Sequence, residues 1–140
     1  MDRTASARWE GGLKDGKGTI STESGVLDAS YSFSKRFEDE KGTNPEELIG
    51  AAHASCFSMA LSMILGEKGY TADSIETSAK VTLSQSDVGF DISKIHLDVV
   101  AAISGADDAA FQEAAETAKA NCPVSKVLNA DISMTAKLKA

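Results

Sequence analysis

The sequence is poor in proline, cysteine and aromatic residues. Its 140 residues include two Pro and two Cys, and only 6% are aromatic. Two cysteines exclude a disulfide-dense scaffold, and so little proline excludes a collagen-like repeat. Because 42% of the residues are hydrophobic and 25% are charged, the chain does not belong to the disordered class. Length and composition together predict a single soluble domain that spans residues 1–140.

Positive charge is also scarce. Lys and Arg number 14 against 21 Asp and Glu, which gives a net charge of −7. Nucleic acids and anionic membranes bind clustered cations, so neither is expected as a partner. The first ten residues contain no apolar segment of the signal-peptide kind, and we therefore expect a cytoplasmic protein.

The longest uncharged run covers residues 48–66, which include no Asp, Glu, Lys or Arg. Its length is close to that of a membrane span. However, it contains His53 and three serines and is flanked by Glu47 and Glu67, without the positive flank that orients membrane helices. We interpret the run as a helix of a protein core.

The limits of this helix are well marked. Asn44 can cap its start, Pro45 suits the first helical position, and Glu47 completes a capping box. Lys68-Gly69 is a typical stop. Apolar side chains cover most of the circumference, which predicts a central helix. One face at helical spacing holds Leu48, Ala52, Cys56, Met59, Ala60 and Met63, while Ile49, Phe57, Leu61 and Ile64 fill much of the rest.

The remaining pattern alternates between strands and one more helix. Strands are predicted at residues 6–9, 18–22, 31–37, 75–83, 90–103 and 132–138. The parity of the apolar residues switches within 90–103, which predicts a β-bulge near Ser93 or Lys94. Asp107 or Asp108 should cap a helix whose apolar stripe is Phe111, Ala115, Ala118 and Cys122. The order of elements predicts an α+β fold with two Cys-bearing central helices packed against β-sheet.

The two cysteines occupy different local settings. Cys56 lies in the middle of its helix, where burial raises a thiol pKa, and no Lys or Arg occurs between Gly42 and Glu67. A reactive Cys56 would therefore need a cation from elsewhere in the protein, or His53 as a base. Cys122 directly precedes Pro123, so it should lie at a chain break that starts a short helix at residues 124–128. There its pKa would be lowered and it could move as a resolving thiol.

Two other interpretations of the cysteines stay open at this point. Both can be inert packing thiols, because free Cys commonly packs as a small hydrophobic residue. A metal site formed by His53, Cys56, His96 and Cys122 is conceivable, but no close ligand spacing supports it.

Several segments of the chain resemble the osmotically inducible protein C (OsmC) family. They are Arg36-Phe37-Glu38, the block from Gly42 to Ser62 that contains His53-Ala54-Ser55-Cys56, and Asn121-Cys122-Pro123-Val124-Ser125. Residues 9–11 and 16–22 resemble the OsmC branch more than its sister, the organic hydroperoxide resistance (Ohr) branch. The resemblance covers almost the whole chain.

This resemblance implies an OsmC-like fold, an intertwined homodimer, and a thiol-dependent peroxidase with a role in stress response. The substrates would be organic hydroperoxides and, less efficiently, hydrogen peroxide. Cys56 would be the peroxidatic cysteine and Cys122 the resolving one, Arg36 would stabilise the thiolate, and Glu46 would orient Arg36. No cofactor or metal is implied, and an external thiol reductant, a lipoyl-type dithiol among the candidates, would restore the enzyme.

Two other functions compete with this one: a dimeric protein that binds apolar ligands and has inert cysteines, and a hydrolase based on Cys56 and His53. The peroxidase also poses a geometric problem. Glu46 and Cys56 are ten residues apart, about 15 Å along a straight helix. Either the helix breaks near Gly50 or the groups come from different chains, and we expect the second arrangement.

Overall fold

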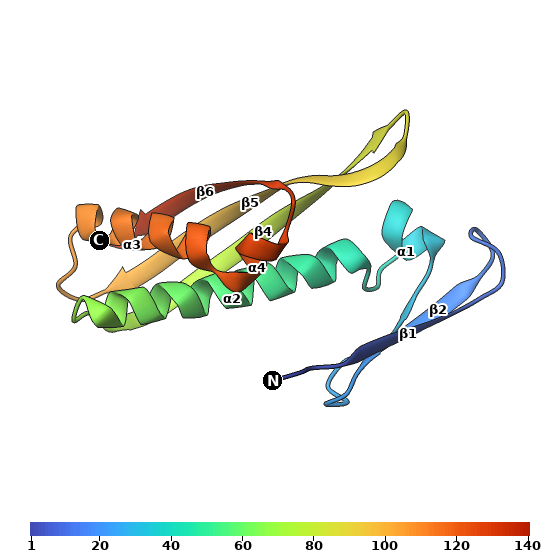
Figure 1. Ribbon diagram of the computed structural model, residues 1–140, viewed down its shortest axis with the longest axis horizontal. Coiled ribbons are helices and arrows are strands. Elements are labelled where there is room, and N and C mark those ends of the chain that lie inside the picture. The colour runs from blue at the N-terminus through green and yellow to red at the C-terminus, as the bar shows by residue number, and fades with distance from the viewer. The chain divides into compact units, whose positions relative to one another are not determined.

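The computed structural model describes all 140 residues, which form two compact parts, Met1–Leu48 and Ile49–Ala140 (Figure 1). The elements are α-helices and β-strands, as the mixed pattern predicts. They follow in the order β1 (Ala5–Glu10), β2 (Lys17–Thr22), β3 (Asp28–Tyr31), α1 (Phe33–Phe37), α2 (Pro45–Glu67), β4 (Ala72–Ser86), β5 (Gly89–Ile103), α3 (Asp108–Asn121), α4 (Pro123–Val127) and β6 (Asp131–Leu138).

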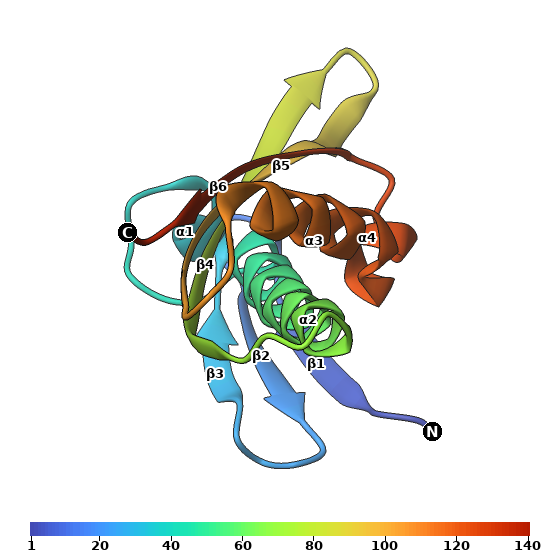
Figure 2. The same ribbon diagram turned by 90° about the vertical axis from the view of Figure 1, so that its left-hand side faces the viewer.

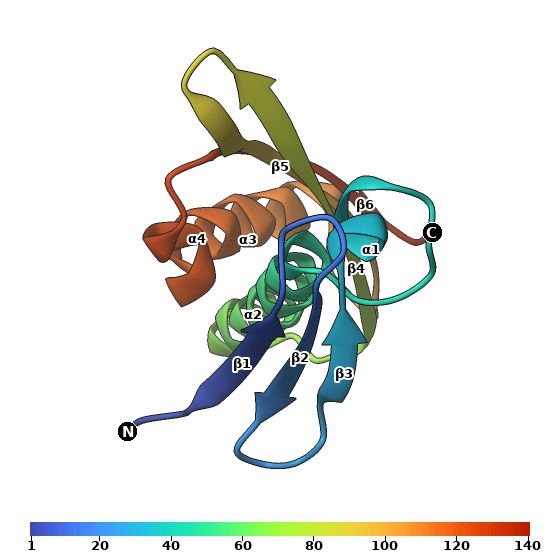
Figure 3. The ribbon, with the colours of Figure 1, turned by 90° about the vertical axis from the view of Figure 1, so that its right-hand side faces the viewer.

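The N-terminal part is an antiparallel sheet in the order β1-β2-β3, followed by the short helix α1 (Figure 3). The prediction of a strand over 31–37 is wrong beyond Tyr31. Ser32 caps α1 instead, because its hydroxyl accepts a hydrogen bond from the Lys35 amide at 3.3 Å. The local capping bond outweighs the apolar alternation that indicated a strand.

Helix α2 starts and ends where the capping signals predict. The Glu47 amide donates to Asn44 Oδ1 at 2.8 Å, and the chain leaves the helix through Gly69 at φ +84. The Tyr70 amide then bonds the Leu65 carbonyl at 2.9 Å. The helix is continuous from Pro45 to Glu67, so it is not broken at Gly50.

Helix α2 is apolar nearly all round but is buried on one side only. His53, Phe57, Leu61 and Leu65 are fully buried, whereas Met59 is 76% exposed. Met63 is also exposed, at 62%. The sequence pattern does not indicate which side packs, because apolar residues occur on nearly every side of the helix.

By length and composition alone, α2 could cross a membrane. One third of its most apolar window is buried inside the protein, and the hydrophobic core includes Phe57, Leu61, Ile64 and Leu65 of this helix. A core helix of a soluble protein passes the same test, and the packing of α2 agrees with the interpretation as a core helix.

The C-terminal part is a three-stranded sheet in the order β4-β5-β6, in which β4 is antiparallel and β6 parallel to β5. Thr82 pairs with Lys94 and Leu83 pairs with Ile92, so Ser93 is the extra residue of a bulge, as predicted. Helices α2 and α3 lie on the same side of the sheet, and the β4–β5 hairpin projects beyond them (Figures 1 and 2).

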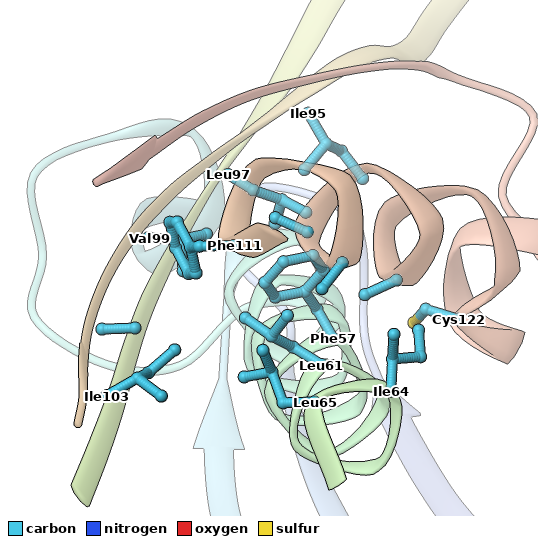
Figure 4. Packing of buried hydrophobic residues seen from close by; sticks show 14 residues of the cluster. Phe57, Leu61, Ile64, Leu65, Ile95, Leu97, Val99, Ile103, Phe111 and Cys122 are labelled. Atoms are coloured by element: carbon cyan, nitrogen blue, oxygen red, sulfur yellow. The ribbon is translucent and has the colours of Figure 1, made fainter. Parts of the chain in front are cut away.

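The hydrophobic core lies between this sheet and the two helices (Figure 4). Phe57 and Leu61 of α2 meet Leu97 and Val99 of β5 and Phe111 of α3, all at most 1% exposed. Asp107 caps α3 by accepting from the Ala110 amide at 2.7 Å, and the predicted stripe of α3 is buried. No residue of Met1–Leu48 belongs to this core.

Candidate functional site

The two cysteines meet although 66 residues separate them in the sequence. Cys56 lies on α2 and is partly buried, while Cys122 is fully buried. Their Sγ atoms are 2.9 Å apart and both are free thiols. Two thiols in contact can form a disulfide with little chain movement once one of them is oxidised.

Cys122 is not inside a helix but at the junction of two. It ends α3, where its amide donates to the Ala118 carbonyl at 2.9 Å. It also starts α4, where its own carbonyl accepts from the Lys126 amide at 3.1 Å. The predicted chain break before Pro123 is confirmed, with the short helix at Pro123–Val127 instead of 124–128.

The surroundings of the two sulfurs shift their pKa values in opposite directions. Burial and the Cys122 thiol raise the pKa of Cys56, although a hydrogen bond from the Val124 backbone opposes the shift. Burial also acts to raise the pKa of Cys122, but hydrogen bonds from Cys56, Ser125 and the Val124 amide outweigh it and lower that pKa. Within one chain, therefore, Cys122 holds a negative charge more readily than Cys56.

A buried histidine and serine lie next to this pair. His53 is fully buried on α2, one helical turn before Cys56, and Ser125 on α4 is 8% exposed. His53 Nε2 and Ser125 Oγ are 2.7 Å apart. Burial lowers the pKa of His53, so its ring is neutral at neutral pH. The contact of His53 is therefore with Ser125, a residue that the sequence patterns did not single out.

Arg36 and Glu46 form a bidentate ion pair in the N-terminal part. Arg36 Nη2 donates to Glu46 Oε1 at 2.6 Å, and Arg36 Nε lies 3.1 and 3.2 Å from the two carboxylate oxygens. Glu46 is mostly shielded, and the Arg36 side chain is 35% exposed. A paired planar fork has little rotational freedom, so the free guanidinium edge is held ready for another partner.

An apolar pocket of about 260 Å³ lies beside Arg36. Aromatic rings form most of its wall, and the Trp9 and Tyr31 rings are 5.4 Å apart. The sequence did not indicate it, because its residues come from β1, the β1–β2 turn, β3 and α1 with its cap, and they share no periodicity. The lining residues are Trp9, Leu13, Tyr31, Ser32, Phe33, Arg36 and Phe37.

The four residues named by the family resemblance thus fall into two pairs. Arg36 pairs with Glu46 in one compact part, and Cys56 pairs with Cys122 in the other. Ten residues of unbroken helix separate Glu46 from Cys56, about 15 Å of rise. The helix is not broken near Gly50, and the arrangement in which these groups come from different chains stays a prediction.

The metal site considered from the sequence does not form. His96 bonds Ser133 Oγ at 2.6 Å and Thr135 Oγ1 at 3.1 Å on the sheet. No group of three or more His, Cys, Asp or Glu side chains is placed to hold a metal ion.

Comparison with known proteins agrees with the two cysteine blocks. The family model described as OsmC-like protein matches residues 38–137. The chain belongs to the OsmC-like family. It is 56% identical to Peroxiredoxin OsmC of Escherichia coli (strain K12), an alignment that covers 99% of this chain and 98% of that protein.

The sister branch is also similar. Organic hydroperoxide resistance protein OhrB of Bacillus subtilis (strain 168) is 33% identical, with 87% of this chain and 89% of that protein covered. The crystal structure of OhrB superimposes with a TM-score of 0.69 at 30% identity and covers 97% of this chain and 98% of that one. The α+β architecture is therefore that of the OsmC and Ohr proteins, and the family gives the chain a peroxide-related redox role as a peroxidase.

Proposed function

We propose that this protein is a thiol-dependent peroxidase that reduces organic hydroperoxides, and hydrogen peroxide less efficiently, to alcohols or water. The observation that carries the proposal is the contact of two free thiols at 2.9 Å, one partly exposed and one buried. A partly exposed sulfur can meet a substrate, while a buried sulfur in contact with it can trap the oxidised product. Cys56 is then the peroxidatic cysteine and Cys122 the resolving one.

The reaction has three balanced steps. The Cys56 thiolate attacks the O–O bond, takes up one oxygen as sulfenic acid, and the alkoxide leaves and is protonated to the alcohol. The Cys122 thiolate then attacks the Cys56 sulfur, the S–S bond forms, and the hydroxide that leaves becomes water. An external dithiol, such as a lipoyl-type group, supplies two electrons and restores both thiols.

Cys56 needs a cation, because burial raises its pKa and its own helix has no Lys or Arg before Lys68. Arg36 is that cation in our proposal, held in position by Glu46. The guanidinium lowers the thiol pKa and donates hydrogen bonds to the peroxide oxygens as charge moves onto the leaving alkoxide. Since about 15 Å of helix lies between Glu46 and Cys56, each ion pair serves the Cys56 of the other subunit.

Two features of the single chain support the homodimer that this arrangement requires. The N-terminal part contributes no residue to the hydrophobic core, and every residue of β1 is exposed. A small sheet without a core needs a partner surface for stability. In addition, α2 leaves Met59 and Met63 exposed on an uncharged face. A second copy that covers both surfaces gives an intertwined dimer with a site at each end of the interface.

The pocket beside Arg36 supports an organic substrate. Its walls are mainly aromatic, and an apolar R group of a hydroperoxide would be desolvated there while the peroxide oxygens face the guanidinium. The cytoplasmic location stays a prediction.

The test is a titration of free thiols after the reduced protein is incubated with cumene hydroperoxide. We expect loss of both thiols and one equivalent of cumyl alcohol per subunit. Cys56→Ser should abolish alcohol formation, whereas Cys122→Ser should release one equivalent and stop at the sulfenic acid. Unchanged thiols would contradict the proposal and leave the apolar-ligand-binding function, in which both cysteines are inert.

A further inference from the structure

The buried pair of His53 and Ser125 has no role in the steps described above. Both residues are buried, and their 2.7 Å contact joins α2 to α4 across 72 residues of sequence. Ser125 lies in the first turn of α4, three residues after Cys122, and its side chain acts to lower the pKa of the Cys122 thiol. Two contacts, His53 with Ser125 at 2.7 Å and Cys122 with Cys56 at 2.9 Å, thus lie one turn of α4 apart.

The unpartnered atom of His53 indicates the direction of these hydrogen bonds. His53 Nδ1 is buried and has no hydrogen-bond partner. A buried N–H without an acceptor is rarer than a buried acceptor without a donor, so the proton of the neutral ring belongs on Nε2. Nε2–H then donates to Ser125 Oγ, which leaves the hydroxyl proton of Ser125 free to donate to the sulfur of Cys122.

We infer that His53 and Ser125 are positioning residues for Cys122: His53 holds the Ser125 hydroxyl in the orientation in which it donates to the Cys122 sulfur. The inference rests on the proposed function, in which Cys122 acts as a thiolate twice. It attacks the Cys56 sulfenic acid, and it is the group that leaves when a reductant thiolate attacks the Cys56 sulfur of the disulfide. In that second event the reductant forms a bond to Cys56, the S–S bond breaks, and its electron pair remains on Cys122.

Burial and access favour the same order of events. Cys56 is partly exposed and Cys122 is fully buried, so an external thiol reaches the Cys56 sulfur first. The better stabilised thiolate leaves faster, and the hydrogen bond from Ser125 supplies that stabilisation. His53 and Ser125 therefore favour formation of the disulfide. They also favour its reduction by attack at Cys56, with Cys122 as the leaving thiolate.

Few other groups can influence the titration of Cys122. The groups that act on it are the Cys56 thiol of α2, the side chain and amide of Ser125, and the Val124 amide of α4. The nearest charged residue on α3, Lys119, is paired with Glu116 at 3.1 Å. Lys126 of α4 is exposed.

The experiment measures the pH midpoint of Cys122 thiolate formation by ultraviolet absorbance in a Cys56→Ser background, where Cys122 is the one thiol present. Ser125→Ala should raise the midpoint by about one pH unit, because a hydrogen bond to a charged group is lost. His53→Leu should raise it in the same direction, and His53→Gln, whose amide can donate to Ser125, should restore it. Ser58→Ala is the matched control, because it removes a hydroxyl that bonds Thr77 at 2.8 Å on the same helix as His53.

The double variant of His53→Leu and Ser125→Ala separates positioning from packing. If His53 acts through Ser125, the double variant has the midpoint of Ser125→Ala alone. Additive shifts, or midpoints that stay at the parental value while the free energy of unfolding falls, would overturn the inference. Should His53→Leu fail to fold, His53→Met, which also lacks a donor, replaces it.

A kinetic measurement with the Cys56-containing protein completes the test. In Ser125→Ala, cumene hydroperoxide should oxidise Cys56 to the sulfenic acid at the same rate as in the unmodified protein. Formation of the disulfide near neutral pH should be about tenfold slower in the variant. Equal disulfide rates would overturn the inference. Failure of the proposed function gives a different result, because no alcohol would form although the titration of Cys122, which needs no hydroperoxide, still shifts.

Discussion

Mixing a weakened variant with an inactive one tests whether Arg36 serves the thiol of its own chain or that of a partner. Arg36→Ala removes the guanidinium, and Cys56→Ser removes the nucleophile. Loss of a cation beside a thiolate raises its pKa by one to three units, so Arg36→Ala should lose about 10- to 1000-fold in activity near neutral pH. Cys56→Ser should be inactive. Neither homodimer contains a complete site.

The mixed dimer differs between the two arrangements. Arg36 is held by Glu46, and Cys56 lies about 15 Å further along an unbroken helix. If Arg36 acts across the interface, a mixed dimer has one site with both Arg36 and Cys56 intact and one site with neither. Random exchange of equal amounts makes about half of the dimers mixed, so about a quarter of the unmodified activity should return.

The assay is turnover of cumene hydroperoxide after the two variants exchange subunits, with two affinity tags to measure the mixed fraction. Cys56→Ser mixed with Cys122→Ser is the matched control. Because these two sulfurs touch within one chain, that mixed dimer has no complete pair and should stay inactive. Absence of recovered activity in a verified Arg36→Ala and Cys56→Ser mixture would refute the arrangement across the interface.

Three further predictions concern the fold. Phe57→Ala should lower the free energy of unfolding by about 3–5 kcal/mol in urea titration, because the ring is fully buried, whereas Val88→Ala at the exposed hairpin turn should change little. Asn44→Ala should cost about 1 kcal/mol by the same measurement, since the Glu47 amide loses its cap, and an unchanged stability would count against the capping role. Burial lowers the pKa of His53 in the folded state. As the pH falls below the ordinary value of 6.5, the unfolded chain therefore binds a proton before the folded protein does. The free energy of unfolding should be at its full value above that pH and decrease below it. His53→Gln should make this decrease smaller. If the free energy of unfolding, measured by chemical denaturation between pH 5 and 7, changes equally with pH in the variant and the unmodified protein, His53 is not the group responsible.

Local signals in the sequence were enough for most of the elements. The parity switch at Ser93 and the break before Pro123 are features of the local sequence pattern. The caps at Asn44 and Asp107 are each a hydrogen bond between residues close in the chain. Such bonds depend little on the rest of the fold, and the structure has them where they were predicted. The strand expected over 31–37 failed for the same kind of reason, since the Ser32 cap is a local bond that competed with a weaker periodicity.

For the candidate site, the sequence predicted some features and tertiary structure decided others. The residue blocks around Cys56 and Cys122 were sufficient to identify the family, and the uncharged sequence of α2 already required a cation from elsewhere. The amino-acid order by itself thus determined the family, and it predicted that a reactive Cys56 needs a cation from outside its own helix. Tertiary structure alone decided two contacts. His53 bonds Ser125 across 72 residues, and aromatic rings from β1, β3 and α1 meet beside Arg36. Tertiary structure also decided which face of α2 is buried. Contacts between distant segments depend on how the whole chain packs, and so does the choice among equally apolar faces. Neither produces a periodic pattern in the sequence.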